Sequence, residues 1–377
     1  MAYVAARGGE HAIQQAEHFY RELLGTLSLE RVKTIEDTLP YLLDRVMGEA
    51  SLYAPELAAL AIAQTGGDLY EAVLLLRAYR TTQPRLAYAA PLEQADLQTV
   101  RRISAAFKDI PGGQVLGPTL DYSHRILKME TLRGEQTEQR VTPAVQPSPS
   151  SFPALTAWQR GAGLLPEINA DQTAPSEIPD VTREPLLFPV SRAHKLQSLA
   201  RADTGGALAL GYANMRGYGA VHPTINEVRL AYADVLLTHP STGARFSAGQ
   251  VRVSSSEIVT NFAGDPKDPR LELGFSATLG WNEVKAIAAS MLDLSMERAS
   301  HPSQTPEFVL YHTEAVEGSG FCIHFKLPHF VTFQSSLEAM RDVRAKGAEG
   351  ERQKAKGDGN SSSNSVSSDV AREEVMR

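Results

Sequence analysis

The sequence predicts an α+β protein with a mainly helical N-terminal domain, a mixed α+β domain and a disordered C-terminal tail. Apolar residues recur at helical spacing over residues 38–107, where short connections join the segments. Residues 186–335 mix helical and β-branched segments without regular βαβ alternation, which favours α+β over α/β. The expected parts are a helical domain (1–130), a variable linker (131–185), an α+β domain (186–345) and the tail (346–377).

Composition limits the classes of protein to which the chain can belong. It has 377 residues, 42% of them hydrophobic, which suffices for a core and about two domains. The net charge of −7 argues against indiscriminate nucleic-acid binding. A single cysteine fits a reducing compartment. Because we find no signal-peptide pattern and no apolar stretch of membrane-spanning length, we expect a cytoplasmic protein.

The N-terminal domain is expected to begin with a short strand at residues 2–6. Gly8-Gly9-Glu10 then precedes a helical pattern through Leu24. A strand, two glycines and a helix start can bind an anion through free backbone N–H groups, although an ordinary turn is the commoner interpretation. Leu42, Leu43, Val46 and Met47 form an apolar stripe at helical spacing, which predicts one further helix. Three more helices are expected at residues 56–64, after Pro55, at 69–81, after Gly66-Gly67-Asp68, and at 93–107.

Two arginines, Arg77 and Arg80, lie three residues apart at the end of the expected helix 69–81. At that spacing they share a helix face and can meet a phosphate. Arginines in a last turn more often complement the helix dipole, and we favour that interpretation.

A loop rich in glycine and proline is expected at residues 108–125, and its backbone can approach a ligand closely. It is not a Walker loop, because no Gly-Lys-Ser/Thr follows. Donors and acceptors surround the glycines, and the candidates are Lys108, Gly112, Gly113, Asp121, His124 and Arg125.

The linker at 131–185 is rich in Pro, Ser, Thr, Gln and Glu, and we expect Trp158 and Leu164–Leu165 to pack against the body. The α+β domain that follows contains two expected helices, 191–202 and 281–297. Its expected strands are 208–215, 225–237, 251–259, 271–275, 308–312 and 321–325. From about Ala345 the chain becomes charged and then Ser/Asn-rich, which predicts disorder.

A second candidate ligand contact is Arg216-Gly-Tyr-Gly-Ala-Val-His-Pro223. Arg216 can clamp a phosphate while Tyr218 stacks on a base, although a tight turn with a surface arginine is the commoner interpretation of this pattern. His222 is either a proton donor or a loop histidine. Glu227 is either a catalytic carboxylate or a solvated strand residue.

A histidine pair, His324 and His329, is the most distinctive local pattern. The two lie five residues apart around Pro328, with Cys322 just upstream. They can converge on a metal only if the chain bends between them. Two ligands are too few for zinc, so further ligands must come from Cys322 or from elsewhere. The alternative interpretation of Cys322 is a small buried apolar residue that binds no metal.

Taken together, several of these segments resemble the PhnI family of the bacterial carbon–phosphorus lyase system. The resemblance rests on residues 3–10, 77–82, 108–125, 216–223 and the His324–His329 element, in this order over about residues 1–340. It implies synthesis of α-D-ribose 1-methylphosphonate 5-triphosphate from ATP and methylphosphonate with release of adenine. It also implies a purine nucleosidase activity (ATP or GTP to ribose 5-triphosphate and base) for the subunit alone.

The resemblance further implies partners and a metal. The partners are PhnG, PhnH and PhnJ in a core complex with two copies of this subunit, and the ATPase-like PhnL. His324 and His329 are implied to hold zinc at the boundary with PhnJ, whose cysteine supplies a further ligand. Two other functions stay open: an assembly scaffold whose catalysis needs partner surfaces, and a stand-alone zinc hydrolase with a complete metal site.

The reaction implied by the resemblance passes through an oxocarbenium-like state at C1′ of the ribose. We expect Lys108, Gly112, Gly113 and Arg125 to hold phosphates and Arg216 to bind the phosphonate. Asp121 or Glu227 is expected to face the developing cation, and His124 or His222 to protonate the departing base.

Overall fold

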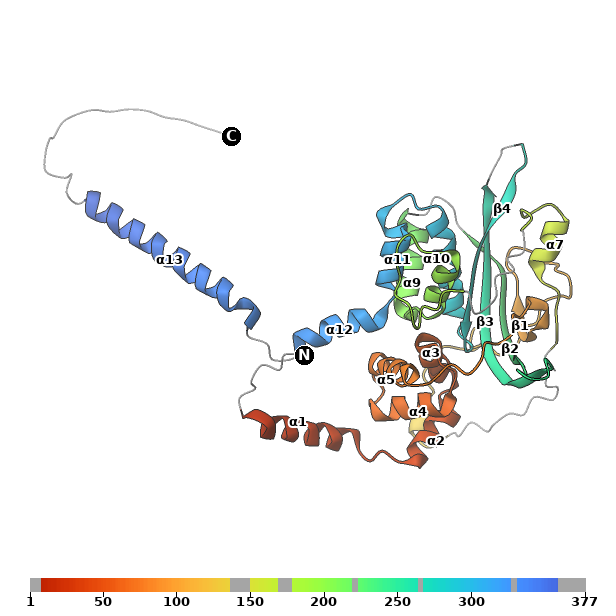
Figure 1. The fold of residues 1–377 in the computed structure, drawn as a ribbon, viewed down its shortest axis with the longest axis horizontal. Coiled ribbons are helices and arrows are strands. Elements are labelled where there is room, and N and C mark those ends of the chain that lie inside the picture. Colours follow the sequence, from red (N-terminus) through yellow and green to blue (C-terminus); the bar gives the residue numbers. More distant parts are fainter. Residues whose placement is uncertain are drawn as a thin grey trace. The chain divides into compact units, whose positions relative to one another are not determined.

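The computed structural model describes residues 8–135, 150–168, 178–218, 223–263, 267–326 and 331–358. The chain divides into two compact units, of which residues 24–321 form one, and 1–23 with 322–377 form the other. Within the described residues, the chain forms helices and an antiparallel sheet of four strands (Figure 1). The predicted α+β class is therefore confirmed.

The helices near the N-terminus of the larger unit follow the local signals in the sequence. They are α2 (Leu29–Thr38), α3 (Pro40–Ala50), α4 (Pro55–Gln64) and α5 (Leu69–Thr81). The Asp68 side chain accepts hydrogen bonds from the backbone N–H groups of Tyr70 and Glu71 and so caps α5. Their core is formed by Leu43, Val46, Met47, Ala58, Ala59, Ile62, Ala72, Val73 and Leu76. The expected helices at 56–64 and 69–81 are confirmed.

The sheet has the order β1-β2-β3-β4 with neighbouring strands antiparallel. Its strands are β1 (Gln98–Ile103), β2 (Thr224–Thr238), β3 (Arg245–Ala263) and β4 (Arg270–Leu279). Helices α8 (Arg192–Ala200), α9 (Thr204–Ala213), α10 (Glu283–Glu297) and α11 (Pro306–His312) lie on one side of the sheet (Figure 1). Between them lies a second core that includes Leu199, Ala207, Ala288, Leu292 and Leu310.

The expected helix at 93–107 is wrong, because this segment forms a 3-10 turn, η1 (Gln94–Asp96), and strand β1. Arg102 pairs with Arg229 and Ile103 with Val228 across the ladder to β2. Thr99, Val100 and Ile103 are β-branched and fit a pleated surface. A pairing partner more than a hundred residues away therefore decides the structure of this segment.

Three expected strands are helices in the structure. Residues 208–215 fall mainly in α9, whose Asp203 cap accepts a hydrogen bond from the Gly206 N–H at 2.5 Å. Gly211 of α9 lets the helix approach α10, since a Cβ there would lie 3.3 Å from the Ala288 carbonyl oxygen. Residues 308–312 fall in α11, which Thr305 caps, and 321–325 fall in α12 (Ala315–Lys326). For α9 and α11, helix caps and packing prevail over the apolar pattern.

The expected linker contains short structured pieces, α6 (Met129–Leu132) and α7 (Leu155–Gly161). Leu155 and Leu165 are buried, and the Trp158 ring packs edge-on against Phe107 with centroids 5.6 Å apart. The expectation that this part packs against the body is confirmed. The structure also contains the π-turn η2 (Asn214–Tyr218) and the 3-10 turn η3 (Pro302–Gln304).

Helices α1 (Gly9–Leu24) and α13 (Val331–Asp358) lie near the two ends of the chain. The expected helix through Leu24 is confirmed, whereas the strand expected at 2–6 lies outside the described residues. Residues 346–358 of the predicted tail are helical, and the rest of it is likewise outside the described ranges. In the described part of the chain, no single helix has the length and apolar character to cross a membrane; only α3 and α4 taken together, bent by 96°, reach that composition.

Candidate functional site

The loop at residues 108–125 is held against the sheet by a buried arginine of β1. Arg102 is fully buried, and its Nη1 donates to the carbonyl oxygens of Pro111 at 2.6 Å and Gly113 at 2.9 Å. Gly112 has φ +83°, and a Cβ there would lie 2.9 Å from the Phe152 ring and 3.3 Å from Arg102 Nη1. Glycine is therefore required at this turn because both the backbone conformation and the close approach exclude a side chain.

The charge of Arg102 is balanced inside the protein by Glu227. The Nε–H group of Arg102 donates to Glu227 Oε1 at 2.5 Å, and that of Arg229 donates to Oε2 at 2.7 Å. Arg229 also donates to the carbonyl oxygens of Gln94 and Pro153 at 2.9 and 2.8 Å. Glu227 is 1% exposed, so this geometry favours a role in holding the loop and the 152–153 segment over contact with a substrate.

A second carboxylate, Glu257, lies beside this network. It accepts hydrogen bonds from Gln94 Nε2 at 2.8 Å and Asn226 Nδ2 at 2.9 Å. Burial and the nearby Glu227 carboxylate raise the pKa of Glu257 to about 7, although its two hydrogen bonds act in the opposite sense. Glu257 is therefore a buried carboxyl group of the sheet whose charge changes near neutral pH.

The exposed part of the loop brings Asp121 and Arg125 together. Arg125 Nη2 donates to Asp121 Oδ1 at 2.5 Å, and Thr119 Oγ1 donates to Asp121 Oδ2 at 2.8 Å. The buried Arg101 lies under them, with Nη2 3.9 Å from Asp121 Oδ2 and Nε 2.6 Å from Glu283 Oε1. The loop thus presents a carboxylate and a cation to solvent above a buried arginine.

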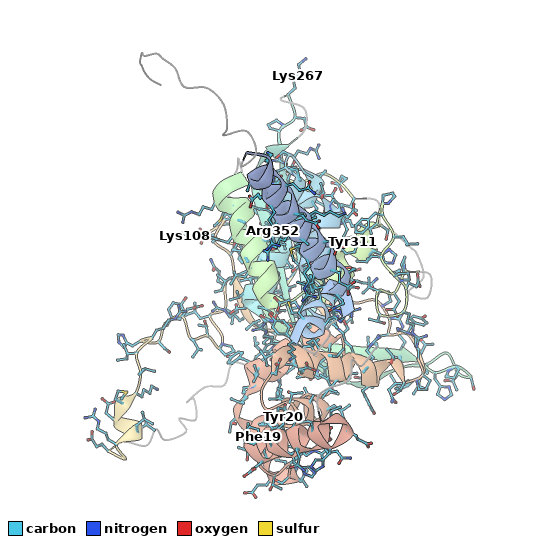
Figure 2. All side chains as sticks on the ribbon, turned by 90° about the vertical axis from the view of Figure 1, so that its left-hand side faces the viewer. Phe19, Tyr20, Lys108, Lys267, Tyr311 and Arg352 are labelled. Carbon is cyan, nitrogen blue, oxygen red and sulfur yellow. The ribbon has the colours of Figure 1, made fainter. Side chains whose placement is uncertain are left out.

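Lys108 and His124, the other two polar candidates of the loop, are both exposed. Lys108 points outward from the body of the molecule (Figure 2). The described residues give neither side chain a fixed partner on the loop, so their placement leaves both accessible to a ligand.

Arg216 lies in the turn η2 and is held by the preceding helix. Its Nη1 donates to the Tyr212 hydroxyl at 2.6 Å, and its guanidinium lies 5.8 Å from the Tyr212 ring centroid. Tyr218 is the last residue of η2. His222 lies outside the described residues. The structure therefore shows an exposed arginine on a π-turn and leaves its proposed phosphonate contact a prediction.

The metal prediction falls partly outside the described residues, because His329 does. His324 is on α12 and exposed, as is Cys322 on the same helix. No group of three His, Cys, Asp or Glu residues suited to a metal ion occurs within the described ranges. The described part of the chain therefore contains one histidine of the predicted pair and no complete zinc site.

A concentration of arginines beside residues 178–183 has no counterpart in the residues singled out above, apart from Arg80. A cavity of about 720 Å³ is lined by Arg80, Arg85 and Arg183 together with Thr81, Gln83 and Thr182. A cavity of about 330 Å³ shares Arg80, Arg85 and Thr182 and adds Asp180. The pair Arg77 and Arg80 was the only local signal, because the other residues come from distant parts of the sequence.

The comparisons with known proteins agree with the resemblance. Residues 2–347 match the family model described as "Bacterial phosphonate metabolism protein (PhnI)". The chain is 45% identical, over 92% of its length and 97% of the relative, to "Putative C-P lyase subunit protein HtxH" of Stutzerimonas stutzeri.

Two further relatives are named "Alpha-D-ribose 1-methylphosphonate 5-triphosphate synthase subunit PhnI". The one from Escherichia coli (strain K12) is 40% identical over 91% of this chain and 98% of the relative. The one from Rhizobium meliloti (strain 1021) is 39% identical over 91% of this chain and 95% of the relative. The chain is thus a bacterial phosphonate metabolism protein by class. It belongs to the PhnI family.

Proposed function

We propose that this chain is a subunit of the carbon–phosphorus lyase system that takes part in making α-D-ribose 1-methylphosphonate 5-triphosphate. The supporting observation is the 39–40% identity over 91% of the chain to two proteins named as that synthase subunit. The reaction is a transfer: a phosphonate oxygen bonds to C1′ of ATP as the bond from C1′ to adenine breaks. In the subunit alone, water takes the place of the phosphonate, which gives nucleosidase activity.

The chemistry requires a carboxylate near the cationic ribose, a proton for the departing base and cations for the phosphates. Asp121 and Arg125 supply a carboxylate and a cation on the same exposed loop. We assign Asp121 to the developing cation, His124 or His222 to base protonation, and Lys108 with Arg125 to phosphate. Arg216 is assigned to the phosphonate. Glu227 is given a supporting role because Arg102 and Arg229 occupy its carboxylate.

Zinc is part of the proposal as a site shared with a partner subunit. His324 and His329 would hold the ion, with a further ligand supplied by a cysteine of PhnJ. Bound zinc would supply a fixed positive charge at that boundary. We propose PhnG, PhnH and PhnJ as core partners with two copies of this chain, PhnL as a further partner, and a cytoplasmic location.

A second candidate function is that of an assembly scaffold. Helix α1 exposes Ile13, Phe19, Tyr20 and Leu23, and Phe19 and Tyr20 are 62% and 51% exposed (Figure 2). Exposed aromatic and aliphatic side chains on one helix are typical of contact surfaces between subunits. In this case the isolated chain is expected to release no base. A stand-alone zinc hydrolase has no such support, because the described ranges contain no set of three metal ligands.

The test is chromatography of the full-length chain incubated with ATP, with detection of adenine and ribose 5-triphosphate. Release of adenine by the chain alone would support the catalytic assignment. If folded chain releases none, the assay is repeated with the partner subunits and methylphosphonate. Absence of the methylphosphonate product there would remove the proposed function.

A further inference from the structure

The cavity of about 720 Å³ next to the end of α5 has an unusual balance of charge for this acidic chain. Its lining includes Arg80, Arg85 and Arg183 and no Asp or Glu. The adjoining cavity of about 330 Å³ adds a single carboxylate, Asp180. The chain as a whole carries a net charge of −7, so three arginines lining one cavity without a carboxylate indicate a place built for an anion.

Two of these arginines have no hydrogen-bond or ion-pair partner in the described part of the chain. Among the described residues, the side chains of Arg80 and Arg183 make no hydrogen bond or ion pair, although Arg80 is half-buried. Burial lowers the pKa of Arg80, and the charges of Arg85 and Arg183 act in the same direction, while Asp180 opposes them. The two neighbouring guanidinium groups therefore repel that of Arg80, and Asp180, which is already bonded to Arg85, is the one carboxylate that lines either cavity.

Arg85 is positioned by its neighbours with one donor unused. Its Nη2 donates to Asp180 Oδ2, and its guanidinium lies 4.8 Å from the Tyr88 ring centroid. Its Nε is buried and has no hydrogen-bond partner within the described part of the chain. An unsatisfied buried donor on a cation is costly unless a ligand or solvent accepts its hydrogen bond.

The wall formed by residues 178–183 is fixed to the body, which gives the cavity a defined shape. Gln197 Nε2 donates to the Pro179 carbonyl at 2.5 Å, and the Val181 N–H donates to Gln197 Oε1 at 3.3 Å. Arg201 Nη1 donates to the Val181 carbonyl at 2.8 Å. Asp180 accepts from the backbone N–H of Thr182 at 2.9 Å and from its hydroxyl at 2.5 Å. Arg183 is thus held beside Arg80 by a well-bonded turn.

We propose that Arg80, Arg85 and Arg183 form a binding site for a phosphoryl-bearing anion, and that its ligand is the triphosphate chain of the nucleotide. The planar forks of arginine fit phosphate oxygens bidentately, and a volume of about 720 Å³ lies within the range of small-molecule sites. The identity of the ligand rests on the proposed function, whereas the presence of an anion site does not. The three arginines then share the binding of the triphosphate with Lys108 and Arg125 of the loop, while Asp121 stays assigned to the ribose.

The test is calorimetric titration of the full-length chain with inorganic tripolyphosphate, ATP and methylphosphonate in separate experiments. The variants are Arg80→Gln, Arg183→Gln and the double substitution. Each single change is expected to weaken tripolyphosphate and ATP binding about tenfold or more, since it removes charge-assisted hydrogen bonds. Arg80→Lys, which retains the charge and loses the fork, is expected to bind with intermediate affinity.

The control is Arg133→Gln, which removes the same charge from an exposed arginine that lines none of these cavities. The site is overturned if the wild-type chain does not bind tripolyphosphate, or if the double variant binds it as well as the wild type or the control does. A loss confined to methylphosphonate binding would overturn the triphosphate assignment. Tripolyphosphate binding without any base release in the complete complex would remove the proposed function and leave the anion site in place.

Discussion

Glu227 of β2 and Glu257 of β3 lie directly opposite each other in the sheet, paired in register inside the protein. Like charges at such a position are destabilising. Two arginines, Arg102 and Arg229, hold Glu227 as the carboxylate, while neutral Gln94 and Asn226 contact Glu257. The two carboxyl groups therefore differ in environment, and the proton is expected on Glu257.

The substitution Glu257→Gln is expected to remove a pH dependence of stability. The pKa of Glu257 is raised to about 7 in the folded protein from its ordinary value of 4.5. Its contribution to stability is therefore fully present below the lower value and lost as pH rises through about 7. Relative to wild type, the variant should gain on the order of 2 kcal/mol at pH 8 and little at pH 5. Chemical denaturation across this pH range measures the difference.

The Glu257→Gln variant can keep its hydrogen bond to Gln94. The Gln94 Oε1 atom has no partner in the described structure, and the Gln94 side-chain amide can rotate so that this oxygen accepts a hydrogen bond from the new amide group. The control is Glu130→Gln, the same change at an exposed position, which should leave the stability curve unchanged. A difference curve for Glu257→Gln that is flat from pH 5 to 8 would show that Glu257 stays ionised in the fold.

Replacing Arg102 with methionine is expected to destabilise the protein by about 3–5 kcal/mol, because it leaves a buried carboxylate short of a cation. The carbonyl oxygens of Pro111 and Gly113 lose their donor as well, so hydrogen exchange at the backbone amides of Gly112 and Gly113 should accelerate. Denaturation and exchange measured by mass spectrometry test both effects. Arg125→Met, at a side chain 73% exposed, should change stability by less than about 0.5 kcal/mol. Equal effects of the two substitutions would argue against a special role for Arg102.

How far the fold could be predicted depended on how local its causes are. Helices α4 and α5 begin at Pro55 and Leu69, where a proline and the Asp68 cap act within one turn. Strand β1 forms by backbone pairing with β2, in which Arg102 lies opposite Arg229. No short window of sequence contains both strands. The error at 93–107 therefore reflects a long-range cause.

The candidate site divides in the same way. Glycines and prolines marked the 108–125 loop, and its Asp121–Arg125 pair lies within one local turn. The arginine cavity is assembled from α5, the segment after it and residues 178–183, which composition placed in a linker. No spacing in the sequence shows that Arg80 and Arg183 converge.

Gly117→Ala is expected to destabilise the loop more than an alanine at another glycine with a positive φ. Gly117 has φ +57°, and a Cβ there would lie 2.3 Å from the Val100 carbonyl oxygen and 2.6 Å from Arg101 Cβ. Gly134 has φ +71° and no atom within 4 Å of such a Cβ. Alanine at Gly134 should cost about 1 kcal/mol for the backbone conformation alone, and at Gly117 at least about 2 kcal/mol. Equal losses in denaturation would mean that β1 moves to accept the methyl group.

Lys285→Met is expected to stabilise the protein at neutral pH. Lys285 is fully buried; burial lowers its pKa from 10.5 to about 8, while Glu49 acts in the opposite direction. The folded state therefore binds this proton less readily than the unfolded state, so stability should rise with pH between about 8 and 10.5. The variant should lack that rise and gain about 2 kcal/mol at pH 7.

Denaturation of wild type and Lys285→Met at pH 7 and at pH 10 measures the effect. Lys108→Met, at an exposed lysine, serves as the control. Its unfolding free energy should change with pH in the same way as that of the wild type. Destabilisation by Lys285→Met at pH 7 would show that the ammonium group is stabilised by Glu49 more than it is penalised by burial.

Asp121→Asn is expected to reduce adenine release by roughly 100-fold or more while the fold stays intact. The side chain is 57% exposed, and its ion pair with Arg125 is on the surface, so the substitution should cost less than about 1 kcal/mol. Asparagine keeps the shape and an acceptor for Thr119, but it loses the negative charge that the proposed function assigns to the oxocarbenium-like ribose. Asp268→Asn makes the same change at a carboxylate 65% exposed and paired with Arg270, and it should retain full activity. Single-turnover chromatography of adenine from ATP separates the two variants, and undiminished release by Asp121→Asn would exclude Asp121 from the chemical step.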